Sequence, residues 1–166
     1  MGRRSLDFRD ADAVIAEIRR LQGGGYTMLG KWTLTQMCEH LTSTFRVGLD
    51  GVDRRLPWLF RKLVGEPMAR HVTRTRRMIS GVPAPREVVP TAPGGPDDPA
   101  LIDACIATIE RARDATSLPR PHPMADLTVA QWKELNWVHC AHHLGFLVPR
   151  DGLAAPAGAA ATGQSA

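Results

Sequence analysis

The stretch that decides the fold is TVAQWKELNWVHCAHHLGFLVP, residues 128–149. Thr128 followed three residues later by Gln131 is a capping-box pattern, which is typical of the first turn of a helix. Apolar residues then recur at helical spacing until just before Pro149, which cannot continue a helix. The stretch therefore predicts an amphipathic helix over about 128–147.

Three further segments show the same helical periodicity, over about residues 10–22, 33–49 and 98–115. The second of them opens with another capping-box pair, Thr33 and Gln36, and the third begins with an aspartate cap followed by a proline. No segment alternates apolar and polar residues as a half-buried strand would. The sequence thus predicts an all-α fold, a four-helix bundle with a long crossover between helices 2 and 3.

The crossover contains a candidate short helix over 57–64 and a proline-rich stretch over 82–99. Residues 51–80 within it carry eight arginines and lysines against one aspartate and one glutamate. Such a patch can attract an anionic substrate or a nucleic acid. The aromatic residues of this segment, Trp58 and Phe60, do not alternate with the arginines, which favours a solvated surface and ranks nucleic-acid binding last.

Length and composition indicate one domain, residues 1–149, followed by an Ala/Gly/Pro-rich tail over 150–166 that we expect to be disordered. The three cysteines, Cys38, Cys105 and Cys140, are an odd number without paired spacing, which predicts buried free thiols in a reducing compartment. No run approaches the roughly 18 apolar residues of a membrane span. We therefore expect a soluble cytoplasmic protein without a membrane partner.

His139 and His143 stand four residues apart on the predicted last helix, hence on one face, and that face is the apolar one. Two imidazoles in an apolar interface are unfavourable unless they find polar partners, and one dication satisfies both. His40 lies at the border of the apolar stripe of the second helix and is the third candidate ligand. Histidines at this spacing also occur by chance, and His40 alone can be read as a half-exposed polar residue.

Four other residues are candidates for the surroundings of this site. Asn136 and His142 flank the histidine pair and are either partners of the ligands or helix-surface residues. His122 precedes Pro123 at the entrance to the last helix, where it either covers the mouth of the site or shapes a turn. Trp58 can close the pocket from the crossover.

Several segments of the sequence resemble the DinB-like superfamily. Within that superfamily they are most similar to a branch catalogued as a domain of unknown function. They are GKWTLTQMCEHL at 30–41, the dipeptide His122-Pro123, and HCAHHLGF at 139–146. The resemblance spans about residues 6–148 and implies a four-helix bundle of DinB type. It also implies that His40, His139 and His143 bind a divalent metal ion, zinc or nickel.

Three neutral imidazoles leave a dication with open positions for a water, a thiolate or a carbonyl oxygen. Relatives in the superfamily include transferases and isomerases that use low-molecular-weight thiols. The resemblance therefore implies a metal-dependent enzyme, a thiol-dependent transferase or a hydrolase acting on a small molecule. The alternative is a module that binds a metal or small ligand without turnover. The sequence assigns no catalytic residue beyond the ligands. It leaves open whether two copies of the chain form a homodimer.

Overall fold

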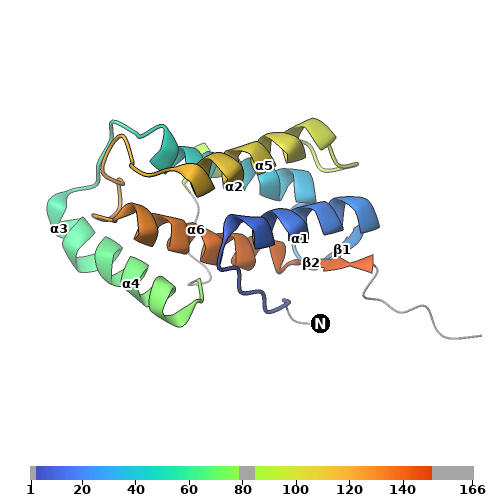
Figure 1. Cartoon of the computed structure of the whole chain (residues 1–166), viewed down its shortest axis with the longest axis horizontal. Coiled ribbons are helices and arrows are strands. Elements are labelled where there is room, and N and C mark those ends of the chain that lie inside the picture. The colour runs from blue at the N-terminus through green and yellow to red at the C-terminus, as the bar shows by residue number, and fades with distance from the viewer. Residues whose placement is uncertain (1–2, 79–84, 151–166) are drawn as a thin grey trace, which may run out of the picture.

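The structure is a computed structural model in which residues 3–78 and 85–150 are described. Four long helices pack on one another around a common core (Figure 1). They are α1 (Ala11–Gly24), α2 (Leu34–Leu49), α5 (Pro99–Asp114) and α6 (Val129–Leu144). The predicted all-α class is confirmed, and the predicted boundaries of these helices differ from the observed ones by at most three residues.

The helix starts follow the capping chemistry of the sequence. Thr33 and Thr128 each form a complete capping box, in which the threonine hydroxyl accepts from the third backbone N–H and the glutamine at that position accepts from the threonine N–H. The carboxylate of Asp10 accepts from Ala13 N at 2.8 Å and begins α1. These local bonds explain why the starts were readable from the sequence.

The last helix ends earlier than predicted, at Leu144. The N-terminal segment packs against the chain at that point. Arg4 N donates to Gly145 O at 2.9 Å, and a Cβ on Gly145 would lie 2.8 Å from Arg4 O. The chain then becomes β2 (Leu147–Pro149), which pairs antiparallel with β1 (Tyr26–Met28). This small sheet, which the sequence did not predict, lies at the end of the molecule away from the crossover helices (Figure 1).

The crossover contains a longer helical arm than the predicted 57–64. The arm joins three elements without a break: α3 (Trp58–Phe60), the π-helical turn η1 (Arg61–Gly65) and α4 (Glu66–Thr75). α4 packs against α6 but buries only Ala69 and Val72. The predicted helix was therefore too short, because α4 is highly basic and its buried face is limited to Ala69 and Val72.

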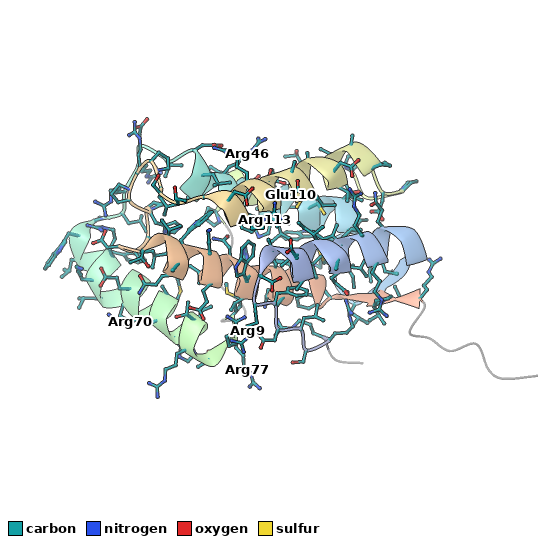
Figure 2. The ribbon with its side chains drawn as sticks, viewed as in Figure 1. Arg9, Arg46, Arg70, Arg77, Glu110 and Arg113 are labelled. Atoms are coloured by element: carbon teal, nitrogen blue, oxygen red, sulfur yellow. The ribbon has the colours of Figure 1, made fainter. Side chains whose placement is uncertain are left out.

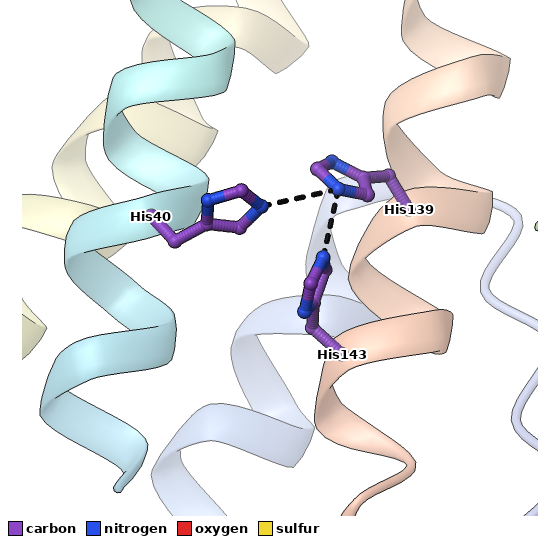
Figure 3. A group of neighbouring side chains, drawn as sticks. All are labelled: His40, His139 and His143. Carbon is purple, nitrogen blue, oxygen red and sulfur yellow. Dashed lines mark hydrogen bonds between the residues drawn. The ribbon is translucent and has the colours of Figure 1, made fainter. Parts of the chain in front are cut away.

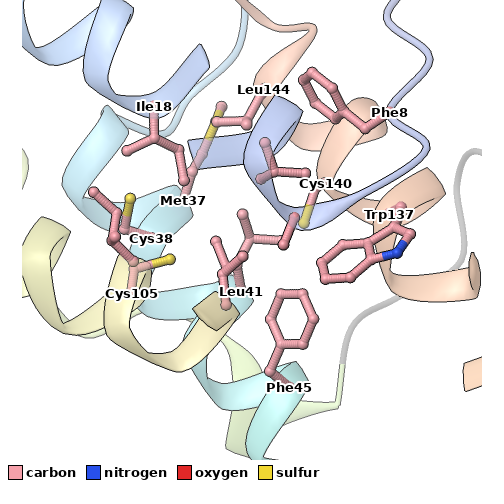
Figure 4. Close-up of a cluster of buried hydrophobic side chains, with 14 of the residues drawn as sticks. Phe8, Ile18, Met37, Cys38, Leu41, Phe45, Cys105, Trp137, Cys140 and Leu144 are labelled. Atoms are coloured by element: carbon pink, nitrogen blue, oxygen red, sulfur yellow. The ribbon is translucent and has the colours of Figure 1, made fainter. Parts of the chain in front are cut away.

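The core joins the four long helices through large aliphatic and aromatic side chains, among them Leu41, Phe45 and Trp137 (Figure 4). All three cysteines lie within it as buried free thiols, as predicted. A hydrogen bond with Cys105 and burial raise the pKa of the Cys38 thiol, and burial raises the pKa of the Cys140 thiol. They are packing groups rather than nucleophiles.

Two further expectations concern the C-terminal tail and membrane-spanning helices. The tail predicted to be disordered, 150–166, lies outside the described residues from residue 151 onward. Across residues 3–78 and 85–150, no helix combines the length and the apolar character that crossing a bilayer requires.

Candidate metal centre

Three histidine side chains from two helices meet in one place (Figure 3). His139 and His143 project from successive turns of α6, and His40 projects toward them from α2. The Nε2 atom of His139 lies 2.8 Å from that of His143 and 3.3 Å from that of His40. One ligand atom from each of the three residues lies within 4.8 Å of the others.

This arrangement fits a divalent metal ion. Two imidazole nitrogens bound at about 2.0–2.1 Å from zinc, at angles between octahedral and tetrahedral, stand about 2.8–3.4 Å apart. The observed separations of 2.8 and 3.3 Å agree with that spacing. Within the described part of the chain, the cluster contains no carboxylate and no thiol, so the donor set is three imidazoles.

His40 is held in the orientation that a ligand needs. Its Nδ1 lies 2.6 Å from the carbonyl oxygen of Val88, in the short helix η2 (Arg86–Val88) of the crossover. Since a carbonyl oxygen only accepts, Nδ1 carries the proton and donates it, which leaves the lone pair of Nε2 facing His139. This is the usual support of a metal-binding histidine by a backbone carbonyl.

Glu39 fastens the crossover at the same place. Its carboxylate accepts from Thr91 N and Ala92 N at 3.0 and 2.8 Å, and from the Thr91 hydroxyl at 2.7 Å. Burial acts to raise the pKa of Glu39, but these hydrogen bonds prevail and hold that pKa below its usual value. Glu39 thus positions the segment that carries Val88, a role that sequence reasoning missed.

The environment keeps the imidazoles unprotonated. Burial and the neighbouring His40 lower the pKa of His139 to about 3. Burial lowers the pKa of His40 despite the bond to Val88, and burial with the adjacent His139 places the pKa of His143 far below its usual value. At neutral pH all three side chains are therefore neutral and able to ligate without first losing a proton.

Trp32 forms one wall of the cluster. Its ring stacks on His143 at a centroid distance of 5.6 Å and an interplanar angle of 15°, and it meets His40 at 5.1 Å and 48°. Trp32 is not among the site residues predicted from the sequence. Its place directly before the Thr33 cap is the signal that relates it to the site, because the first turn of α2 leads to His40.

The other predicted site residues lie in different surroundings. His142 accepts through Nδ1 from the guanidinium of Arg3. Together with the N-terminal segment it lines a cavity of about 210 Å³. The centroid of its ring also lies 5.0 Å from that of His143, with the two rings nearly perpendicular. Asn136 is buried and donates to Trp132 O at 2.8 Å, within α6.

His122 and Trp58 also lie apart from the cluster. His122 accepts from Met124 N at 3.4 Å in the turn before α6, and burial lowers its pKa to about 4. Trp58 is exposed on α3, at one end of the molecule (Figure 1). Among the described residues, ring contacts with the three imidazoles come from Trp32 and His142 and not from Trp58, so the crossover does not close the site in the expected way.

Comparison with known proteins gives one positive finding. No curated protein and no solved structure matches this chain. Residues 1–150, which include the whole histidine cluster, match the profile of one family. By this match, the chain belongs to the family described as "Protein of unknown function (DUF1569)".

Proposed function

We propose that His40, His139 and His143 bind one divalent metal ion, zinc or nickel, and that the protein is a metal-dependent enzyme acting on a small molecule. The observation that carries the proposal is the convergence of one imidazole nitrogen from each of the three residues within 4.8 Å, with His40 already oriented by a backbone carbonyl. The resemblance of the sequence to the DinB-like superfamily, with its four-helix bundle, supports the same reading.

The donor set favours chemistry on an anionic ligand. A bound dication would supply Lewis acidity toward a water, a thiol or a carbonyl group. Three neutral imidazoles add no negative charge, so they preserve the attraction of the site for a thiolate or another anion. Trp32 covers one face of His143, and Val88 keeps Nε2 of His40 directed inward.

A thiol used in the reaction comes from outside the chain. Cys38, Cys105 and Cys140 are buried in the core, and the thiols of Cys38 and Cys140 have raised pKa values. A low-molecular-weight thiol, abundant in a reducing cytoplasm, is therefore the proposed cosubstrate, and the reaction is a thiol-dependent transfer or a hydrolysis.

The foundation of the proposal is tested by metal content and metal affinity. Elemental analysis of protein purified without a metal-binding tag should find about one zinc or nickel per chain. Calorimetric titration with either metal should show affinity losses of orders of magnitude for His139→Ala and His143→Ala, because each removes one ligand. His142→Ala is the matched control, and equal losses at His142 and His143 would contradict the ligand assignment.

Catalysis is tested separately from binding. Metal-loaded protein and the His143→Ala variant are compared in a screen of thiol conjugation and of ester and amide hydrolysis. The proposed enzyme shows turnover that requires both the metal and His143. Metal binding without turnover across the screen would instead support the alternative, a module that holds a metal or small ligand.

A further inference from the structure

The arm carries a concentration of exposed apolar side chains found in no other described part of the molecule. Trp58, Leu59, Phe60, Leu63 and Val64, here called the apolar tip, are each between 42% and 67% exposed. The other large apolar residues that are exposed lie singly, such as Met28 and Leu101. Single exposed residues are ordinary, whereas a contiguous group marks a binding surface.

The turn that carries the apolar tip is anchored to the segment before α6. Arg61 is buried and donates to the carboxylate of Asp126 at 2.6 Å. Gly65 packs so closely on the turn before α6 that a Cβ there would lie 1.8 Å from Met124 O. The tip therefore projects from an anchored turn, with α3 at one end of the molecule (Figure 1).

Basic residues are concentrated on the arm that carries the tip. Residues 53–78 contain eight arginines and lysines against one aspartate and one glutamate. Arg54, Arg70 and Arg74 are exposed, and the described residues include no carboxylate partner for them. Figure 2 labels Arg70 on α4 and Arg77 just after the end of that helix.

We propose that the apolar tip inserts into the interfacial region of an anionic lipid bilayer while the arginines of α4 contact the lipid headgroups. Apolar side chains beside basic ones, with tryptophan and phenylalanine among them, are typical of segments that lie in a membrane interface. Each basic residue near an anionic bilayer adds to the attraction between the protein and the lipid headgroups. The expectation of no membrane partner rested on the lack of a spanning segment, which surface binding does not require.

The geometry favours a bilayer over other occupants. At roughly 100° per residue, the three side chains of α3 alone, at 58, 59 and 60, leave the helix over an arc of about 200°, whereas a protein groove receives a single stripe. A fluid bilayer accommodates such a convex tip. A second copy placed tip to tip would bring two strongly basic segments together, which is unfavourable.

The test is cosedimentation of the full chain with large unilamellar vesicles. Vesicles of phosphatidylcholine with about 30% phosphatidylserine should bind the protein, and binding should weaken in 0.5 M salt and be at least tenfold lower with phosphatidylcholine alone. The double variant Leu59→Ser/Leu63→Ser should lower the partition coefficient at least tenfold. Leu101→Ser, at an exposed apolar position on α5, is the matched control and should bind like the wild type.

Charge and self-association are measured on the same proteins. Arg70→Glu/Arg74→Glu should lower binding to the anionic vesicles at least tenfold, and circular dichroism should show every variant folded. Failure of the wild type to bind anionic vesicles at low salt overturns the proposal, as does an equal loss in Leu101→Ser. Self-association in sedimentation velocity that Leu59→Ser/Leu63→Ser abolishes, with no effect on vesicles, would assign the tip to a second copy instead.

Discussion

Acid should destabilise the metal-free protein through the three histidines of the cluster, and His139 allows the effect to be calculated. An unfolded histidine has a pKa of about 6.5, whereas burial and the adjacent His40 lower the pKa of His139 to about 3 in the folded chain. Between these values the unfolded state binds a proton that the folded state does not. The stabilising contribution is therefore complete above about pH 6.5 and is lost progressively as the pH falls toward 3.

The magnitude follows from the size of the pH change. Each pH unit below about 6.5 removes about 1.4 kcal/mol per such histidine, so His139 accounts for a loss of about 2 kcal/mol between pH 7.5 and pH 5.0. The pKa values of His40 and His143 are lowered too, so their contributions have the same sign. Against a typical total of about 5–15 kcal/mol, the combined loss is large.

The assay is urea unfolding in the presence of a chelator at pH 7.5 and pH 5.0. Wild type should lose about 2 kcal/mol more unfolding free energy between the two pH values than His139→Gln, which lacks the titrating group. His71→Gln, at an exposed position on α4, is the control for the substitution itself. If His139→Gln retained the full pH dependence, proton exclusion by the folded site would be refuted.

Three other outcomes test the packing and the site. Gly48→Ala should lower the unfolding free energy by about 1–3 kcal/mol, because its Cβ would lie 2.3 Å from Nε1 of Trp132. Gly23→Ala is the control: its Cβ would meet nothing within 4 Å, so the change should be neutral or stabilising by up to about 1 kcal/mol. Glu39→Ala should weaken zinc affinity by about 10–100-fold in calorimetric titration, because it loosens the segment that orients His40; unchanged affinity would remove Glu39 from this role. Zinc at about 100 times its Kd should raise the unfolding free energy by about 2.7 kcal/mol at pH 7.5 in thermal or urea melts, and a stability that zinc leaves unchanged would argue against a preformed site.

The long helices were predictable because their determinants are local. A cap and its hydrogen-bond partner are three residues apart, and an apolar stripe repeats within each turn, so both are visible in a short window of sequence. The length of the arm was underestimated because the buried face of α4 consists of only two small or medium residues, Ala69 and Val72. The strand Leu147–Pro149 was missed because its partner, Tyr26–Met28, lies far earlier in the sequence, directly after α1.

The sequence by itself determined the all-α class, the capped ends of the helices and the pairing of His139 with His143, since i and i+4 share a face of any α-helix. Only the tertiary structure decided that His40, 99 residues from His139, meets this pair. It also decided that Val88 orients His40 and that Trp32 walls the cluster. The reason is physical: these contacts depend on how α2 packs beside α6 and how the crossover folds back, and no local periodicity encodes the distance between two helices.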